Sequence, residues 1–495
     1  MDFMELSQLL LGLDYEINNE KDLQLDVNDI IYDSRKAQPE TLFLSIHGID
    51  LNGDDYVLDA YERGCRIFIL EQELQDLPTD TTVVLVSDTR QALSKMSANF
   101  FGHPSKEMTV VGVTGTKGKT TVANYIKKVL CGVGINAGVI GTMGIFYNDQ
   151  EIETINTTPE SYELNKTMRA MLDAGVTAVA MEVSSGGLMM NRVDDIDFDI
   201  GIFTNLSLDH IGPREHPTFE HYRDCKSRLF NLCKYGIINA DDEYAEYMIE
   251  HATCPTTTYS VHHASDYQAH DIQLTRDGWH LGVAFTYDHK GEKTQTHIST
   301  PGEFSVLNAL AVLATTQYLG VPKDEILKTL SRVTIDGRVE VLPVLDDVTV
   351  VIDFAHNGIS LENVLTTLLD YHPKHLICVF GSIGNRAIIR RKELGDVAAK
   401  YCDVAVLTAD NPDREDPQII IDEIAESFVD SKCKVLKIAD RSEAMYEAMK
   451  LAQPGDMVVI AGKGHEKYQV IDGKHVFYDE RAEVIKAAER VKKEK

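Results

Sequence analysis

Apolar runs, glycine turns and amphipathic stretches alternate along most of the chain. From Thr109 to about residue 330, short apolar strands, glycine-containing turns and segments with apolar residues every three to four positions follow one another. This order predicts a parallel sheet with covering helices. Residues 1 to about 105 instead mix β-rich runs (Thr41–Ile46, Arg66–Leu70 and Thr82–Val86) with helical patterns, which predicts a separate α/β domain.

A further α/β unit starts at Thr334–Leu342. Its expected strands are Val348–Ile352, Leu376–Phe380, Asp403–Leu407, Lys434–Ile438 and Asp456–Ile460. Polar residues alternate in period two over about 255–300, which predicts an antiparallel β insertion or edge, and Phe100–Met108 has the Gly and Pro of a linker. The fold class is therefore α/β, with an N-terminal α/β domain (1–105), a central P-loop ATPase-like parallel-sheet domain (106–335) and a C-terminal Rossmann-like domain (336–495).

Length and charge limit the function. At 495 residues the chain is too long for one ordinary domain, and 43% hydrophobic residues suffice for sizeable cores. The formal net charge is −30, with 78 acidic residues against 48 basic ones. Nucleic acids and anionic membranes need cationic surface, so we expect neither as a partner. Small anionic ligands remain possible, because they need only a local cationic site.

The eight cysteines are scattered, and no two of them have CxxC spacing. Neither a zinc cluster nor a redox pair is indicated, and reduced thiols in the cytoplasm are the simplest interpretation. The N-terminal segment is acidic with a short apolar run, so we expect no signal peptide. Without a run of about 18 apolar residues, we expect no membrane span.

The strongest chemical signal is "VTGTKGKT", between an apolar strand at Met108–Val113 and an amphipathic helix. Glycines let successive backbone N–H groups face one anion, and the helix N-terminus adds partial positive charge. Lys119 can reach the β- and γ-phosphates, and the Thr120 hydroxyl can bind Mg²⁺. A tight turn with an incidental lysine is the alternative. The common form has a glycine where Val113 stands. Residues expected to contact the nucleotide are Gly115, Thr116, Lys117, Gly118, Lys119, Thr120 and Thr121.

Two later apolar strands end on possible metal ligands. Glu182 follows "AVAM", and Asp209 and His210 follow "GIFTNLSL". The carboxyl ends of parallel strands are where a sheet presents its ligands. Because an ATP site needs Mg²⁺, which prefers oxygen ligands, Glu182 and His210 are candidates. A capping or core role is the alternative for each.

Lys226, in "HYRDCKSRLF", would by itself be interpreted as a surface lysine. However, GTKGKT, MEVSS, TNLSLDH and HYxxxK in this order resemble the ATP-dependent Mur ligases of bacterial cell-wall synthesis. That resemblance implies that Lys226 is carbamylated to N6-carboxylysine. It also implies Lys119, Glu182, His210 and Lys226 as catalytic residues, with Mg²⁺ held by Thr120, Glu182, His210 and Lys226.

The resemblance extends over the whole chain and is closest to the tripeptide synthetases of that family. It implies that the DSRK stretch, with Ser34, binds uridine diphosphate. It implies contacts to the muramoyl-peptide for Asn156, Thr157, Thr158, Ser184 and Arg192. It places Asn308, Arg338, Asp353 and His356 near the nucleotide. A hairpin turn is the alternative for DSRK, and a surface arginine is the alternative for Arg192.

Four features depart from the family pattern. Gly186, Phe354 and Gly358 stand where His, Tyr and Pro are usual, and the loop at 381–395 differs. Arg391, next to Arg390, aligns best with the arginine that grips the α-carboxylate of the added amino acid. Residues matching the rest of that amino-acid site are Asp410, Asn411, Asp413, Gly462 and Glu466.

The turn "TADNPDREDP" is the expected selectivity element. Diaminopimelate-adding members carry DNPR, in which the arginine binds the distal carboxylate. Here the fourth residue is Asp413, which favours a terminal ammonium and therefore L-lysine, with L-ornithine close behind. Arg414, one position later, leaves meso-diaminopimelate open. Glu415 and Asp416 are interpreted as solvated charges.

The implied reaction is an ATP-dependent ligation in peptidoglycan synthesis. The acceptor is UDP-N-acetylmuramoyl-L-alanyl-D-glutamate, the cofactors are ATP and Mg²⁺, and an acyl phosphate is the intermediate. The expected protein is a cytoplasmic monomer. A related amide ligase such as a folylpolyglutamate synthetase is disfavoured by the DSRK region. A non-catalytic nucleotide-binding scaffold is disfavoured by the intact Lys119, Thr120, Glu182, His210 and Lys226.

Overall fold

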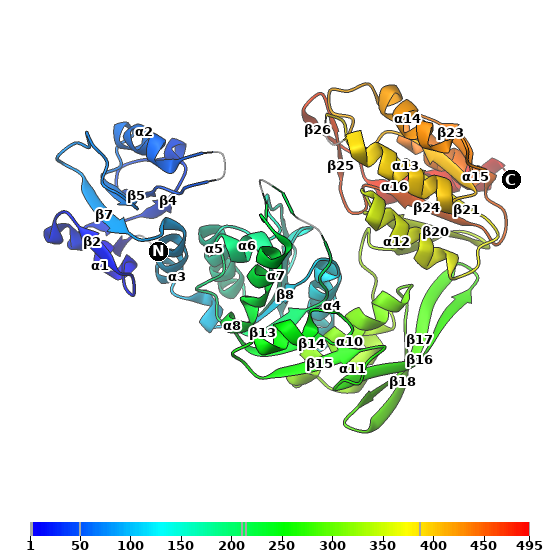
Figure 1. The fold of residues 1–495 in the computed structure, drawn as a ribbon, viewed down its shortest axis with the longest axis horizontal. Coiled ribbons are helices and arrows are strands. Elements are labelled where there is room, and N and C mark those ends of the chain that lie inside the picture. The colour runs from blue at the N-terminus through cyan, green and yellow to red at the C-terminus, as the bar shows by residue number, and fades with distance from the viewer. Residues whose placement is uncertain (1–2, 49–50, 209–210, 213–214, 386–387, 495) are drawn as a thin grey trace. The chain divides into compact units, whose positions relative to one another are not determined.

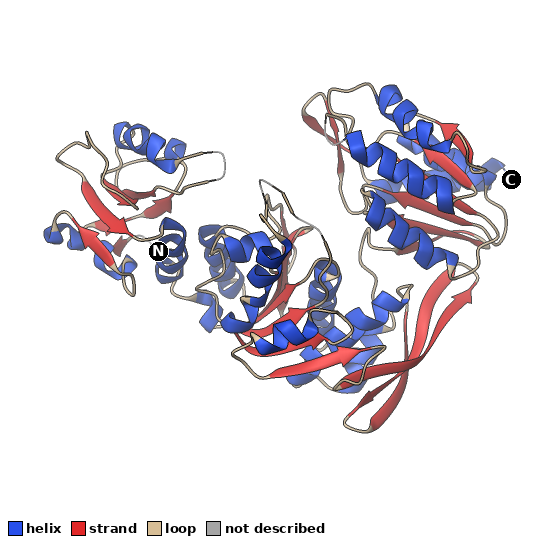
Figure 2. Cartoon of the chain, viewed as in Figure 1, coloured by secondary structure: helices blue, strands red, loops and turns tan. Residues whose placement is uncertain are grey.

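The computed structural model describes residues 3–48, 51–208, 211–212, 215–385 and 388–494. The chain forms two compact units. The first comprises Met1–Asp266 and Ala311–Pro322, and the second comprises Tyr267–Leu310 and Lys323–Lys495. Both are α/β, with sheets covered by helices (Figures 1 and 2), which confirms the predicted fold class.

The N-terminal part of the first unit is built on a sheet of order β2-β7-β6-β5-β4. Four of these strands are parallel, and β2 pairs antiparallel with β7 at one edge. The strands are β2 (Tyr15–Ile17), β4 (Asp29–Ile31), β5 (Thr41–Leu44), β6 (Ile67–Leu70) and β7 (Thr82–Val86), and a separate pair joins β1 (Met4–Glu5) to β3 (Asp26–Val27). The helices are α1 (Leu6–Leu9), α2 (Val57–Glu62) and α3 (Thr89–Phe100). The three β-rich runs predicted here are confirmed.

The central part of the first unit follows the strand order β11-β10-β9-β12-β8-β13-β14-β15. Six of these strands run parallel to one another, namely β8, β9, β12, β13, β14 and β15. Strand β8 lies in the middle and has buried residues on both faces, as expected for a parallel sheet. The strands are β8 (Thr109–Thr114), β9 (Ala137–Gly141), β10 (Gly144–Tyr147), β11 (Gln150–Ile152), β12 (Ala178–Glu182), β13 (Phe198–Phe203), β14 (Cys233–Asn239) and β15 (Thr256–Ser260). The helices are α4 (Lys119–Gly132), α5 (Ser161–Asp173), α6 (Ser185–Met189), α7 (Phe219–Ser227), α8 (Leu229–Leu232) and α9 (Ala245–Glu250).

The second unit begins with an antiparallel meander of β16 (Tyr267–Asp277), β17 (His280–His289) and β18 (Glu292–Ile298). Lys290 and Gly291 both have positive φ (53° and 79°), as the two central residues of a type I′ hairpin turn require. The predicted antiparallel segment is therefore confirmed. Two helices follow, α10 (Glu303–Tyr318), whose residues from Ala311 onward belong to the first unit, and α11 (Lys323–Leu330).

The C-terminal sheet has the order β19-β20-β24-β21-β22-β23, with all strands parallel except β19. Apolar clusters fill both of its faces, one under α12 to α14 and one under α15 and α16. The strands are β19 (Glu340–Leu345), β20 (Val348–Asp353), β21 (Leu376–Phe380), β22 (Val404–Leu407), β23 (Lys434–Lys437) and β24 (Met457–Ala461), with a hairpin of β25 (Tyr468–Ile471) and β26 (Lys474–Phe477). The helices are α12 (Gly358–Leu369), α13 (Ile388–Tyr401), α14 (Pro417–Ala425), α15 (Arg441–Leu451) and α16 (Glu480–Glu494).

The three α/β sheets agree with the three domains expected, whereas the boundaries at 105 and 335 stay predictions. Among the described residues, no helix combines the length and the apolar character that crossing a bilayer demands.

Candidate active site

The predicted strand and helix are present as β8 and α4, and the predicted glycine loop joins them. Gly115 has φ 147° and Gly118 has φ 87°, conformations that disfavour a side chain. A Cβ atom at Gly115 would also overlap Thr204 Oγ1, so both the backbone conformation and the lack of space require glycine at this position. The apolar stripe of α4 (Val122, Ile126, Val129 and Leu130) is buried, which fixes the helix N-terminus at the loop.

Two residues after β13 shape this phosphate loop from outside. Asn205 Oδ1 accepts a hydrogen bond from Lys117 N at 2.8 Å, and Asn205 O accepts one from Thr116 N at 2.8 Å. Thr204 Oγ1 donates to Lys117 O at 2.6 Å. Sequence reasoning singled out Asp209 and His210 in this motif and missed Thr204 and Asn205. Asp209 and His210 lie outside the described residues.

Thr120 and Glu182 meet beside the loop. Thr120 Oγ1 donates to Glu182 Oε2 at 3.0 Å, and Thr142 N donates to Glu182 Oε1 at 2.8 Å. Both Thr120 and Glu182 are buried, and a Cβ atom at Gly141 would overlap the Glu182 carboxylate. A hydroxyl and a carboxylate with no nitrogen or sulfur donor match the ligand preference of Mg²⁺. The residues present therefore fit a magnesium ion.

Two lysines converge on one carbonyl of the loop. Lys226 Nζ donates to Gly115 O at 2.8 Å, and Lys119 Nζ donates to the same oxygen at 2.8 Å and to Thr116 O at 3.0 Å. Lys226 is only 1% exposed and lies over the Tyr222 ring, 4.6 Å from its centroid. The interpretation of Lys226 as a surface lysine is therefore wrong. Both amines are therefore positioned at the loop that is expected to bind phosphate.

The segment around Thr158 lies directly against Glu182. Thr158 Oγ1 donates to Glu182 O at 2.9 Å and accepts a hydrogen bond from Ser184 N at 2.9 Å. Ser184 Oγ in turn accepts from Gly187 N at 3.0 Å and caps α6. Thr157 Oγ1 lies 3.0 Å from Thr142 Oγ1, while Asn156 is half-buried. The structure thus brings Thr157, Thr158 and Ser184 next to the proposed magnesium ligands.

Arg192 holds a carboxylate. Its Nη2 lies 2.7 Å from Glu160 Oε1, and its Nη1 donates to Thr158 O at 3.0 Å. Arg90 Nη1 approaches the other oxygen of Glu160 at 3.6 Å. The side chain of Arg192 is 16% exposed, so it is not a surface arginine. A Cβ atom at Gly186 would have no neighbour within 4 Å, which shows that open space stands where the family usually has histidine.

Ser34 lies after β4, at the carboxyl end of a parallel strand. It is buried and begins the short 3₁₀ helix η2 (Ser34–Lys36), which Asp33 caps. Arg35 pairs with Asp33 at 2.8 Å and holds the pKa of that carboxyl below its ordinary value. The DSRK stretch is therefore a 3₁₀ turn, and the hairpin turn considered as its alternative is not what forms.

In the second unit, Asp353 links the segment that carries Arg338 to the segment that carries His356. Its Oδ2 accepts from Val339 N at 2.7 Å and its Oδ1 from Ala355 N at 2.8 Å. Burial raises the pKa of Asp353 and lowers that of His356, so both groups are biased toward their neutral forms. Arg338 lies over the Phe354 ring at 4.9 Å.

Asn308 is buried in α10. It belongs to the second unit together with Arg338, Asp353 and His356, whereas the phosphate loop belongs to the first. Their joint contact with one nucleotide stays a prediction.

Four residues of the predicted amino-acid site gather around a buried lysine that sequence reasoning missed. Lys463 is fully buried, with Nζ 2.9 Å from Asn411 Oδ1, 2.9 Å from Glu466 Oε2 and 3.5 Å from Asp410 Oδ1. A Cβ atom at Gly462 would come 2.7 Å from Asp410 Oδ2. Glu466, which the sequence offered as a carboxylate for a ligand ammonium, is therefore already paired with Lys463 within the protein.

Asp413 has left-handed backbone (φ 54°), and its carboxylate is used in the fold. Oδ1 accepts from Gly473 N at 2.7 Å, and Oδ2 accepts from Asn385 Nδ2 at 3.0 Å. Arg414 is exposed and lines a cavity of about 500 Å³ together with Ser442, Gln469 and Tyr478. Asp413 lines the same cavity, but its carboxylate is already bound by Gly473 N and Asn385 Nδ2, whereas Arg414 is the more exposed of the two.

Glu415 is not a solvated charge, which corrects the sequence interpretation, whereas Asp416 is exposed as expected. Glu415 receives two hydrogen bonds from Arg391, at 2.7 and 2.6 Å, and Arg391 also donates to Glu423 at 2.7 Å. The guanidinium lowers the pKa of Glu415. Asp416 caps α14 by accepting from Gln418 N at 2.9 Å. Arg391 is 2% exposed, and its guanidinium is paired with carboxylates within the protein.

Comparisons with known proteins agree with this geometry. Residues 113–316 match the family described as "Mur ligase middle domain", and residues 337–464 match "Mur ligase, glutamate ligase domain". The chain is 38% identical over 484 residues to a UDP-N-acetylmuramoyl-L-alanyl-D-glutamate–2,6-diaminopimelate ligase of Caldanaerobacter subterraneus subsp. tengcongensis, covering 98% of each chain. It is 39% identical over 483 residues to the protein of the same name from Clostridioides difficile, covering 96% of this chain and 98% of the relative.

A solved structure of a 2,6-diaminopimelate ligase of this kind superimposes on 99% of both chains. The TM-score is 0.72 and the sequence identity is 28%. The likeness therefore extends over all three sheets.

Proposed function

The chain belongs to the Mur ligase family of ATP-dependent amide ligases, and from this premise we propose that it joins a diamino acid to the D-glutamate of UDP-N-acetylmuramoyl-L-alanyl-D-glutamate. The observation that carries the proposal is the convergence of Lys119, Lys226 and the Thr120–Glu182 pair on one phosphate loop. Phosphoryl transfer depends on positioned positive charge, which Lys119 and the loop N–H groups offer directly, while Thr120, Glu182 and a carbamate on Lys226 offer oxygen ligands to Mg²⁺.

In the first half of the reaction, the D-glutamate carboxylate attacks the γ-phosphorus of ATP. A phosphorus–oxygen bond forms to the substrate, the bond to ADP breaks, and an acyl phosphate results. The loop N–H groups and Lys119 bind the phosphates, while Thr120, Glu182, His210 and carbamylated Lys226 would hold Mg²⁺. The ion would neutralise charge on the phosphate oxygens.

In the second half, the amine of the incoming amino acid attacks the acyl carbon. The tetrahedral intermediate then loses inorganic phosphate and a proton, and an amide remains. Thr158 bonds to Glu182 O, to Ser184 N and to Arg192, and Thr157 lies next to Thr142. These residues are proposed to bind the peptide end of the acceptor. Ser34 and its 3₁₀ turn are proposed to bind the uridine diphosphate end.

The added amino acid is proposed to be 2,6-diaminopimelate. The sequence interpretation favoured L-lysine because Asp413 would attract an ammonium, but that carboxylate is bound to Gly473 N and Asn385. Glu466, the second carboxylate considered for an ammonium, is paired with Lys463 at 2.9 Å. Arg414 supplies the cation that a distal carboxylate needs, and both relatives described above are 2,6-diaminopimelate ligases.

The α-carboxylate of this amino acid is proposed to bind Arg390 rather than Arg391. Arg391 is held by Glu415 and Glu423. Arg390 is half-exposed, and its charge contributes to lowering the pKa of His356, which places it near the DFAHN motif. We also place the reaction in the cytoplasm, where free thiols such as all eight of this chain persist.

One assay tests the proposal. Purified full-length protein is given ATP, Mg²⁺ and UDP-N-acetylmuramoyl-L-alanyl-D-glutamate, with meso-diaminopimelate, L-lysine and L-ornithine in parallel, and ADP release is followed. We expect release that requires the UDP-linked acceptor and is fastest with meso-diaminopimelate. Faster turnover with L-lysine would overturn the amino-acid assignment, and no dependence on the acceptor would overturn the ligase assignment.

A further inference from the structure

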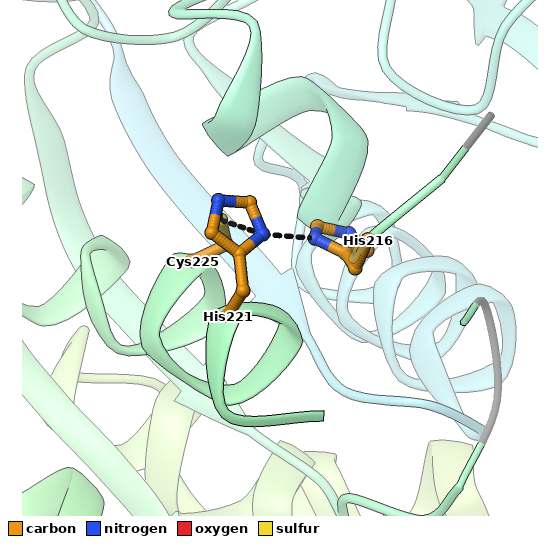
Figure 3. A group of neighbouring side chains, drawn as sticks. All are labelled: His216, His221 and Cys225. Carbon is orange, nitrogen blue, oxygen red and sulfur yellow. Dashed lines mark hydrogen bonds between the residues drawn. The ribbon is translucent and has the colours of Figure 1, made fainter. Parts of the chain in front are cut away.

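Three side chains with nitrogen or sulfur donors meet beside α7 (Figure 3). His216 Nδ1 lies 2.9 Å from His221 Nδ1, and Cys225 Sγ lies 3.8 Å from that nitrogen. One ligand atom from each of the three lies within 4.8 Å of the other two. Cysteine spacing alone did not reveal this cluster, because its members are two histidines and one cysteine.

The fold preassembles these donors. His221 and Cys225 are four residues apart on α7 and therefore lie on one face of it. Thr218 caps the helix, and the ring of His216, which precedes the cap, packs 5.1 Å from the Tyr222 ring. His216 and Cys225 are buried and His221 is half-buried, so little side-chain freedom is left to lose on binding.

The donor set determines which ion fits. Two imidazole nitrogens and one sulfur suit zinc-class ions, whereas Mg²⁺ prefers oxygen. Bonds of about 2.05 Å to nitrogen and about 2.3 Å to sulfur place tetrahedral ligands about 3.3 Å (N···N) and about 3.5 Å (N···S) apart. The separations of 2.9 and 3.8 Å lie within a few tenths of an ångström of those values.

We propose that His216, His221 and Cys225 form a binding site for a divalent transition-metal ion of the zinc class. Three protein ligands leave the fourth tetrahedral position to water or to a small ligand. The site differs in chemistry from the Thr120–Glu182 pair, which offers only oxygen.

The same helix connects this site to the phosphate loop. Tyr222 and Lys226 each follow a metal ligand by one residue; Tyr222 OH lies 3.1 Å from Thr116 Oγ1, and Lys226 donates to Gly115 O. A bound ion joins α7 to the segment that carries His216. The ion therefore stabilises the helix that presents Lys226, and a ligand that binds only the folded state raises the unfolding temperature.

Cobalt spectroscopy tests the site on the full chain. Chelator-treated protein is titrated with Co²⁺ alone, and a tetrahedral cobalt site with a sulfur ligand gives visible bands and a sulfur-to-cobalt charge-transfer band. We expect one equivalent to produce both, Zn²⁺ to displace Co²⁺ and abolish them, and excess Mg²⁺ to leave them. Loss of the bands to Mg²⁺ would assign the ion to the oxygen site and overturn the proposal.

Matched variants assign the ligands. Cys225→Ser is expected to lose the charge-transfer band, whereas Cys131→Ser, at an exposed cysteine outside the cluster, keeps it. His221→Gln, at the half-buried ligand, is expected to weaken Co²⁺ binding at least about tenfold, or about 1.4 kcal/mol. Circular dichroism verifies that each variant is folded. Absence of a sulfur band in the wild type, its persistence in Cys225→Ser, or wild-type affinity in folded His221→Gln would each overturn the site.

Discussion

Lys226 is the residue on which the first half of the proposed reaction depends most. It is buried, and its amine touches the same loop carbonyl as Lys119. We expect Lys226→Ala to lower ligase activity at least about 1,000-fold, because a positioned charge in a dry site contributes several kcal/mol to phosphoryl transfer. A short-chain carboxylate added to this variant should restore part of the activity by replacing the carbamate.

Lys128→Ala, at an exposed lysine of α4, is the matched control and should keep wild-type activity with no response to the carboxylate. Full activity in Lys226→Ala would refute the carbamate role.

Arg414 and Asp413 differ in what their charges already touch. Since Arg414 lines the cavity, Arg414→Ala should raise KM for meso-diaminopimelate about 10- to 100-fold and change kcat little, in line with a charged hydrogen bond of about 1.5–3 kcal/mol. Asp413→Asn should leave KM within about threefold, because its carboxylate holds the Gly473 turn. Steady-state kinetics with varied amino acid measure both. The reverse ranking would mean that the aspartate faces the ligand.

His465 ties stability to pH. Burial lowers its pKa to about 4, and Arg338 and Lys463 add to the effect. Between about 4 and the unfolded value of about 6.5, the unfolded chain binds a proton that the folded chain does not. Stability from this group is therefore complete above about pH 6.5 and declines as pH falls toward 4, by at most about 1.4 kcal/mol per unit.

Denaturant unfolding from pH 7 to pH 4 measures the effect. The difference in unfolding free energy between wild type and His465→Gln should shrink toward low pH, while His262→Gln, at an exposed histidine, should follow the wild type throughout. Parallel pH curves for wild type and His465→Gln would contradict the assignment.

Among the elements, the turn between β8 and α4 is where we expect a substitution of glycine to be tolerated least. Gly115→Ala would force a Cβ into Thr204 at a φ of 147°, so we expect the variant to lose ATP binding at least about tenfold. Gly134→Ala, just past the other end of α4, also places alanine at a positive φ (84°), but no atom lies within 4 Å of the added Cβ. It should cost about 1 kcal/mol of stability and leave ATP affinity unchanged. Equilibrium nucleotide binding to both variants decides between local strain and a specific phosphate-loop effect.

Elements buried on both faces were predictable from sequence, whereas charge pairing was not. The five strands predicted for the C-terminal sheet match β20 to β24 within one residue at each end, because parallel strands in a covered sheet are mostly continuous apolar runs. The charges of the acidic turn were misinterpreted from sequence, because their partners lie far away along the chain. Glu415 pairs with Arg391 of α13, and Asp413 accepts a hydrogen bond from Gly473, in a hairpin some 60 residues away. Sequence spacing cannot tell a paired carboxylate from a free one, and here that distinction changed the expected substrate.

For the whole molecule, the second unit joins segments that the predicted boundary at 335 separates. Tyr371 OH donates to Gly282 O at 2.8 Å and accepts from Gly302 N at 3.1 Å. Leu281 lies in the same apolar cluster as α12 and α13, and Arg276 donates to Gly455 O at 3.1 Å. The meander is thus part of the core that stabilises the C-terminal sheet.

We therefore expect a fragment of residues 336–495 to unfold cooperatively, but at a lower urea concentration than the same sheet in the full chain. Tyr371→Phe should cost the full chain about 1–3 kcal/mol, because a buried carbonyl and a buried N–H lose their partner. In the fragment both partners are missing already, so the same substitution should cost less than about 0.5 kcal/mol. Hydrogen exchange of β20, β21 and β24 reports both values. Equal costs in fragment and full chain would show that the meander does not stabilise the sheet and that the predicted boundary marks an energetic division.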